Sequence, residues 1–220
     1  MRLTLLIATL VVTPFVYAAS LNDGLRAIKG GKFKEAYAIL KPIAEKGNSQ
    51  AQYNLGVMYR DGYGVKENCE LAKKWFLESA KQGDVSAQYN YARLHNAGAC
   101  KPYDLKVAAK WYEVAANKIH VGAMHNIGIM YQYGEGVSKD LNKAKKYLTH
   151  ASKKGHSASS YQLGVMYFTE EPMKNFVISL AWLKKSKNSG YIQADSAIKI
   201  VLKSMSQEQI KKANKLVSEL

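Results

Sequence analysis

The hydrophobic positions of this chain recur with a fixed period. Ala51, Leu55, Met58 and Tyr59 fall at i, i+4, i+7 and i+8, which places one apolar stripe on a helix. Equivalent stretches begin at residues 51, 87, 123 and 159, each 36 residues after the one before. A period of this length is typical of an array of stacked structural units. We therefore predict an all-α array.

A second motif keeps the same phase. Large aromatic residues recur 36 residues apart and finally 35 apart, at Trp75, Trp111, Tyr147 and Trp182. Small residues stand three places before each of them, at Ala72, Ala108, Ala144 and Ser179. Two motifs in phase indicate that each 36-residue unit is a helix, a loop and a second helix.

Turn and cap signals separate the two predicted helices of a unit. Glycine pairs that can adopt positive φ occur at Gly62-Tyr-Gly64 and Gly134-Glu-Gly136. Side chains that can cap the second helix follow the loops, at Asn68, Asp104, Asp140 and Asn175. Gly83 and Gly155 are expected to end that helix. Gly56, inside the first helix, predicts close approach of the partner helix.

The expected domain organisation follows from these signals. We predict a signal peptide at residues 1–18 and one repeat domain at 19–220. Its units are about 21–50, 51–86, 87–122, 123–158 and 159–193, with capping helices at 194–220. A closing helix with a polar face is expected because a bare end would expose the stacking surface.

The N-terminal segment has the three-part pattern of a secretory signal. Arg2 precedes an apolar run from Leu3 to Val12, and small residues precede a cleavage point expected after Ala18. A membrane-spanning helix is the alternative, but the run is interrupted at Pro14 and is shorter than the ~20 residues that a bilayer requires. We expect a periplasmic or secreted protein without an integral membrane segment after cleavage.

The two cysteines, Cys69 and Cys100, are expected to form a disulfide in an oxidising compartment. They lie in corresponding regions of consecutive units, which stacking brings together. A bridge over this separation would contribute about 3–4 kcal/mol through loop-closure entropy. Two separate buried thiols are the alternative. Structural zinc would require four ligands, which two cysteines do not supply.

Composition adds one unusual property, a formal net charge of +15 that is carried mainly by lysine. Lysine is poorer than arginine at bidentate recognition of phosphate, so nucleic-acid binding is disfavoured. A solvated lysine-rich surface and attraction to an acidic partner both remain open.

No catalytic, metal or cofactor site is expected. The five histidines lack the helical pair and third ligand of a zinc site. Ser196-Ala-Ile-Lys199 fits the S-x-x-K pattern of β-lactam-active enzymes, but the companion motifs are missing. The expectation is a non-enzymatic protein.

The units alternate the motifs A-Q-Y-N-L-G-V-M-Y, G-x-G-V, an acidic or amide cap and A-x-x-W. This pattern resembles the Sel-one-like repeat, a relative of the tetratricopeptide repeat. The resemblance covers about residues 21–205. It implies a right-handed α-solenoid whose first helices line a concave groove, in an adaptor that binds another protein or peptide. We expect a monomer. Departures concentrate in unit 87–122, at Ala92, His95, Gly98-Ala-Cys-Lys101 and Ile119.

The resemblance also suggests groove residues on the first helices, at positions next to the core stripe that we expect to be exposed. They are Tyr53, Asn54, Arg60, Tyr89, Asn90, Arg93, His125, Asn126, Tyr161 and Gln162. Aromatic and amide groups on rigid helices suit a peptide groove. The alternative is that they form hydrogen bonds between helices. A cell-wall or β-lactam-acting enzyme is the alternative function, and nitrocefin turnover abolished by changing Ser196 would indicate it.

Overall fold

The computed structural model describes residues 19–96 and 100–220, so the expected signal peptide lies outside the described residues. This part of the chain contains only helices. They are α1 (Leu21–Lys29), α2 (Phe33–Glu45), α3 (Ser49–Asp61), α4 (Cys69–Lys81), α5 (Val85–His95), α6 (Leu105–Asn117), α7 (Val121–Tyr133), α8 (Leu141–Lys153), α9 (Ser157–Thr169), α10 (Phe176–Asn188), α11 (Ala194–Leu202) and α12 (Gln207–Leu216). Short 3-10 helices occupy Glu171–Met173 and Val217–Glu219.

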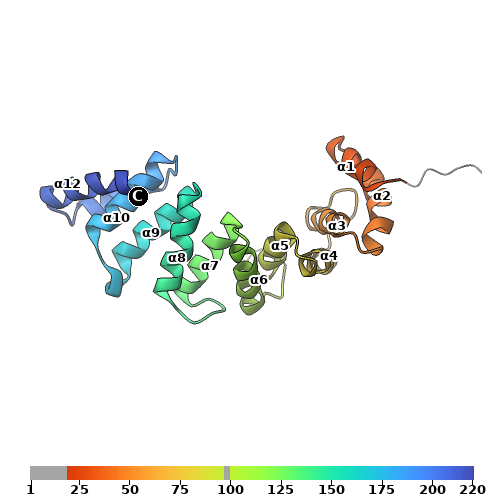
Figure 1. The fold of residues 1–220 in the computed structure, drawn as a ribbon, viewed down its shortest axis with the longest axis horizontal. Coiled ribbons are helices and arrows are strands. Elements are labelled where there is room, and N and C mark those ends of the chain that lie inside the picture. The colour runs from red at the N-terminus through yellow and green to blue at the C-terminus, as the bar shows by residue number, and fades with distance from the viewer. Residues whose placement is uncertain (1–18, 97–99) are drawn as a thin grey trace, which may run out of the picture.

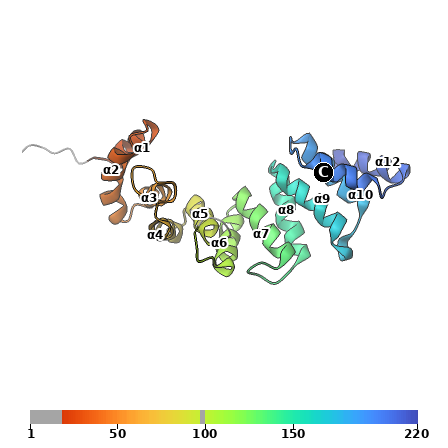
Figure 2. The ribbon, with the colours of Figure 1, turned by 180° about the vertical axis from the view of Figure 1, so that it is seen from behind.

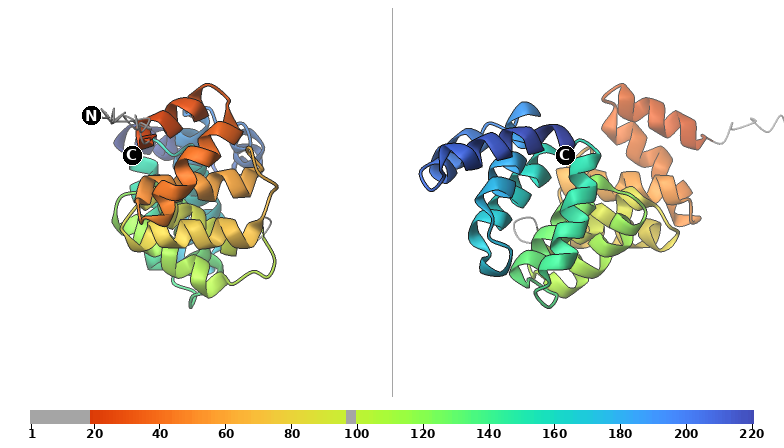
Figure 3. Two further views of the ribbon diagram at one scale, coloured as in Figure 1. Left: turned by 90° about the vertical axis from the view of Figure 1, so that its right-hand side faces the viewer. Right: turned by 60° about the vertical axis from the view of Figure 1, so that its left-hand side comes forward.

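Consecutive helices form hairpins that pack as a repeat solenoid. Each helix packs mainly against its neighbours in the chain, for example α3 against α4 and α4 against α5. The chain descends from α1 and α2 to α6 and rises again toward α12, so the array is curved (Figure 1). α3 and α5 lie on the inner side of this curve relative to α4 and α6, and the reverse view agrees (Figure 2). The end-on view in the left panel of Figure 3 shows the hairpins layered one on another.

The predicted caps are present at the starts of the second helices. The Asn68 side-chain oxygen accepts a hydrogen bond from the Leu71 backbone N–H at 2.9 Å. Asp104, Asp140 and Asn175 cap α6, α8 and α10 in the same way. These side chains satisfy backbone donors that the helix itself leaves without partners. Local sequence therefore fixes where the second helices α4, α6, α8 and α10 begin.

The glycines inside the first helices allow close approach, as predicted. A Cβ built on Gly56 would lie 2.6 Å from the ring of Phe76 on α4. At the equivalent Gly128 it would lie 2.8 Å from Leu148 Cγ on α8. Any side chain at these positions would collide with the partner helix. The tight hairpin therefore explains why glycine recurs despite its helical cost.

The C-terminal end of the array is closed by α11 and α12. Ser206 and Gln209 form a capping box at the start of α12. Ala213 of α12 is buried with Leu180 and Leu183 of α10 and Val201 of α11. The rest of α12 is mainly polar, which suits a helix that covers the last stacking surface.

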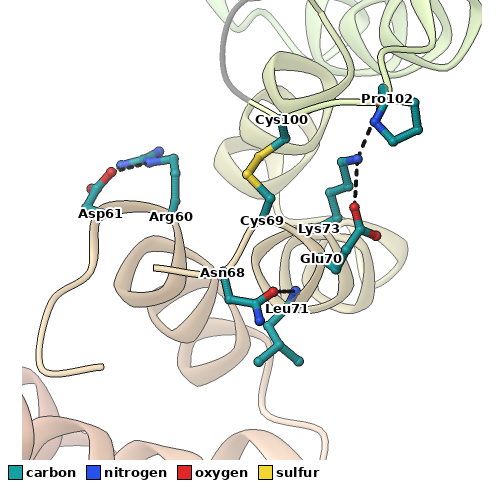
Figure 4. The surroundings of a disulfide bond; sticks show 9 residues. All are labelled: Arg60, Asp61, Asn68, Cys69, Glu70, Leu71, Lys73, Cys100 and Pro102. Carbon is teal, nitrogen blue, oxygen red and sulfur yellow. Dashed lines mark hydrogen bonds and ion pairs between the residues drawn. A yellow bond between two sulfur atoms is a disulfide. The ribbon is translucent and has the colours of Figure 1, made fainter. Parts of the chain in front are cut away.

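The expected disulfide joins adjacent hairpins. Cys69, the first residue of α4, is bonded to Cys100 with a Cα–Cα distance of 5.6 Å (Figure 4). Cys100 is almost fully buried and belongs to the segment that leads from α5 to α6. The bond therefore holds this inter-helix segment against the preceding unit.

No helix in the described part of the chain is long and apolar enough to cross a membrane.

Candidate functional site

The predicted groove residues lie in register on α3, α5, α7 and α9. Tyr53, Tyr89, His125 and Tyr161 occupy equivalent positions on these four helices and are all half-buried. Each ring therefore has one side in contact with protein and another at the surface. The unit period places similar groups on successive first helices, which is the geometry that a peptide-binding surface needs.

Three of these four rings pack onto a ring just before the next first helix, whereas Tyr53 packs on Phe76 of α4. Tyr89 stacks on His120 with ring centroids 4.3 Å apart, and His120 is the N-cap of α7. Tyr161 packs on Tyr191 at 5.1 Å, shortly before α11. His120 and Tyr191 were not among the residues predicted for the groove. The signal that could have found them is a ring 30 or 31 residues after Tyr89, His125 and Tyr161, whereas Asp84 stands at this spacing from Tyr53.

The third member of this series is a pair of histidines. His125 and His156 have ring centroids 4.6 Å apart, and both Nδ1 atoms lie 2.9 Å from the Ser159 hydroxyl oxygen. Burial, together with the neighbouring His156, lowers the pKa of His125 to about 4. Burial also lowers the pKa of His156. Both rings are therefore neutral at pH 7 and join α7 to the start of α9.

Asn90 was expected to be exposed, and this expectation was wrong. Asn90 is only 7% exposed, and its side-chain oxygen Oδ1 accepts a hydrogen bond of 2.6 Å from Arg60 Nη1. The Asn90 amide N–H donates to the Ser86 carbonyl at 2.9 Å. The amide is thus used in joining two units, because Arg60 reaches it from the preceding first helix.

Arg60 is also engaged by its own neighbour. Its Nε and Nη2 atoms donate to the two carboxylate oxygens of Asp61 at 2.7 and 2.6 Å. These hydrogen bonds lower the pKa of Asp61 and raise the pKa of Arg60. Arg93 is less constrained, because it is exposed and lies 5.8 Å from the centroid of the Tyr89 ring. Arg93 is therefore the more accessible cation of this surface.

The remaining amides have local partners. Asn54 donates to the Gln50 carbonyl of its own helix at 2.7 Å. Gln162 donates to Gln132 Oε1 at 2.7 Å, across adjacent units. The Asn126 side chain hydrogen-bonds to Tyr112 and opposes the rise in the Tyr112 pKa that burial causes. Of these amides, Asn54 is the one that bonds within its own helix.

Charge separates the two sets of helices. α7 and α9 contain no Asp, Glu, Lys or Arg, whereas α8 and α10 contain seven lysines and no acidic residue. The excess positive charge therefore lies mainly on the second helices and the loops. The surface of the first helices is polar and aromatic, with Arg60 and Arg93 near its N-terminal end.

The last two candidates are a β-lactam-active serine and a metal site. Ser196 and Lys199 both lie exposed on α11. Among the described residues there is no group of three or more His, Cys, Asp or Glu side chains placed to hold a metal ion.

Comparison with known proteins agrees with this architecture. The protective antigen c5321 of uropathogenic Escherichia coli, which displays an SLR fold, has a TM-score of 0.78 and 27% identity over 91% of this chain. This chain spans 45% of that antigen. A Sel1 repeat protein from Oxalobacter formigenes has a TM-score of 0.71 and 24% identity, covering 81% of this chain and 74% of its own.

The sequence comparisons identify the repeats. A search of curated proteins found no match. The Sel1 repeat model matches residues 49–84, 85–120, 121–156 and 157–191. Each of the first three matched units begins at the first residue of a first helix and ends at the N-cap residue of the next first helix. These four units make up well over half of the chain, which therefore belongs to the Sel1 repeat family.

Proposed function

We propose that this protein is an exported, non-enzymatic scaffold that binds a segment of another protein along the first helices α3, α5, α7 and α9. The observation that carries the proposal is the register of half-buried aromatic and amide groups on these four helices. Such groups offer contact area and hydrogen bonds without a large cost in side-chain entropy.

Family membership supports the general role. Sel1 repeat proteins typically act as protein-interaction scaffolds and are generally non-enzymatic. Asn90 and Gln162 form hydrogen bonds with neighbouring units. The contacts of Asn54 and Arg93 lie within their own helices, so these two side chains are better placed to bind a partner. We therefore assign partner contact chiefly to Asn54, Arg93 and the rings of Tyr53, Tyr89 and Tyr161.

Two observations support a location outside the cytoplasm. The Cys69–Cys100 disulfide suits an oxidising compartment. A structural relative is described as a protective antigen. Together with the predicted signal peptide, they favour the periplasm or the extracellular space, where the partner is an envelope or host protein.

Site-specific photo-crosslinking tests the binding surface. A photoreactive phenylalanine derivative replaces Arg93 or Tyr161 on the first helices, and matched control variants carry it at Lys110 of α6 or Lys146 of α8. In native cells, we expect a discrete protein adduct from the first-helix positions alone. The adduct from position 161 should weaken in the Asn54→Ala and Arg93→Glu variants without a change in melting temperature. Equal adducts from both sets of positions would refute the assignment of this surface.

A further inference from the structure

The second complete unit differs from the others at the end of its first helix. Tyr59, Tyr131 and Tyr167 occupy a position at which this unit has His95. The Tyr59 hydroxyl lies 2.8 Å from that of Tyr37, and the Tyr131 hydroxyl donates to Glu113 at 2.9 Å. In both cases the tyrosine reaches the second helix of the preceding unit. His95 is shorter and has no hydroxyl, so the same junction is left incompletely filled.

A pocket of about 480 Å³ occupies this junction. It lies between α4, the end of α5 and the segment that Cys100 anchors to α4. The volume is within the ~300–1,000 Å³ range of small-molecule sites. Its lining residues are Glu70, Lys73, Lys74, Leu77, Tyr91, His95, Pro102, Tyr103 and Asp104. The pocket is therefore shared between the unit that departs most from the repeat pattern and α4 of the unit before it.

His95 brings unsatisfied polar groups to the pocket. Both ring nitrogens are buried and have no hydrogen-bond partner among the described residues. Burial lowers the pKa of His95, and the nearby Lys73 ammonium lowers it further, so the ring is neutral at pH 7. A neutral imidazole offers one donor and one acceptor. Buried polar groups are rarely left unpaired, which points to a ligand or water that supplies the partners.

Lys73 places a charge at the same point. It is buried although it is a lysine, and its ammonium donates to Glu70 Oε1 at 3.1 Å and more weakly to the Pro102 carbonyl at 3.5 Å (Figure 4). Figure 4 shows this side chain beside the disulfide. An ammonium has three donors, so it can bind a further acceptor. Buried lysines are uncommon unless they are paired, which favours a built site.

Acidic groups balance the basic ones. The pocket has two lysines, Lys73 and Lys74, and two carboxylates, Glu70 and Asp104. Asp104 Oδ1 accepts the capping hydrogen bonds of α6, which leaves Oδ2 without a hydrogen-bond partner among the described residues. A ligand with a single charge would be attracted by one pair of these groups and repelled by the other. A ligand with both charges would match them.

We propose that this pocket binds a small zwitterion with an apolar side chain, of the amino-acid class. Its carboxylate accepts hydrogen bonds from Lys73 and from the His95 N–H. Its ammonium lies against Glu70 and Asp104. Its side chain packs on Leu77, Tyr91 and Tyr103, whose apolar surfaces form the rest of the wall. This site uses Tyr91 and His95 of α5, whereas the protein-binding proposal uses Tyr89 and Arg93, so the two proposals are independent.

Three matched probes test the charge requirement. L-phenylalanine has both charges, 3-phenylpropanoate lacks the ammonium, and phenethylamine lacks the carboxylate. Each is titrated into the folded, oxidised protein while the ring signals of His95 and Tyr91 are followed by NMR. We expect saturable shifts with phenylalanine and at least about tenfold weaker binding of the other two, since each loses charge-assisted hydrogen bonds. Equal binding of either analogue, or no shift with any probe at 10 mM, would overturn the proposal.

Variants locate the site. His95→Tyr restores the residue of the other units, so it should fold normally, fill the pocket and abolish binding. Lys73→Met should weaken phenylalanine binding at least about tenfold. Lys145→Met is its matched control, because Lys145 is the equivalent of Lys73 two units later and lies outside the pocket. Unchanged binding in His95→Tyr, or equal losses in Lys73→Met and Lys145→Met, would place the ligand elsewhere.

Discussion

Arg60 Nη1 donates a hydrogen bond of 2.6 Å to Asn90 Oδ1, and this bond ties the first helices of two consecutive units together. The residues are 30 positions apart and belong to α3 and α5. Asn90 is therefore part of the junction between the units and is a weak candidate for holding a partner. The equivalent Asn54 instead donates its hydrogen bond to the Gln50 carbonyl within its own helix.

Asn90→Ala is expected to lower the free energy of unfolding by about 1–2 kcal/mol, since hydrogen bonds to a charged group contribute more than neutral ones and Arg60 is partly exposed. Asn54→Ala is the matched control and should cost less than ~0.5 kcal/mol. Urea unfolding of both variants measures the difference. Equal losses would show that the Arg60 hydrogen bond adds nothing to the junction.

Removal of the disulfide should destabilise the array. The bond links residues 31 positions apart, and loop-closure entropy predicts a loss of about 3–4 kcal/mol in the double variant Cys69→Ser/Cys100→Ser. Urea unfolding under non-reducing conditions compares the variant with the wild-type protein. A thiol assay on unreduced, denatured protein should detect no free thiol. Two titratable thiols would contradict the bond.

Ile119 occupies a position where glycine is expected. Its φ is +65°, in the left-handed region, whereas the equivalent residues are Gly83 and Gly155. A β-branched residue is strained there, and its side chain is largely exposed, so little packing would be lost on its removal. Ile119→Gly should therefore stabilise the protein by about 1 kcal/mol. Gly155→Ile, its reciprocal control, should destabilise it, and a loss of stability in Ile119→Gly would disprove the strain.

The histidine pair makes stability depend on pH. Because burial lowers the pKa of His125 from 6.5 to about 4, the unfolded chain binds more protons between these values. The stabilisation is present above pH 6.5 and is lost as the pH falls toward 4. We expect a loss of about 1–2 kcal/mol, less than the full shift would give because the ring is partly in solvent.

Thermal unfolding between pH 7.5 and pH 4 measures this effect. His125→Tyr introduces the residue found at the equivalent positions 53, 89 and 161, and it should reduce the pH dependence. His150→Gln is the control, since His150 is exposed on α8 and should leave the profile unchanged. A profile that is equally steep in His125→Tyr would assign the dependence to other groups.

Sequence alone determined the array and the limits of its helices. The 36-residue period placed both helices of each unit, and the cap residues Asn68 and Asp104 fixed where second helices start. Gly56 predicted the close approach that Phe76 makes. These features depend on side-chain periodicity and on hydrogen bonds within a few residues, which can be recognised along the chain.

Only the tertiary structure decided which side chains meet between units. It joined Arg60 to Asn90 and placed His125 against His156. It also left the His95 nitrogens, beside Lys73, without a hydrogen-bond partner among the residues that the structure describes. The physical reason is that these contacts depend on how far each hairpin is rotated and displaced on the next. Neighbouring units can repeat the same helices while their side chains find different partners, so the period alone does not determine the contacts.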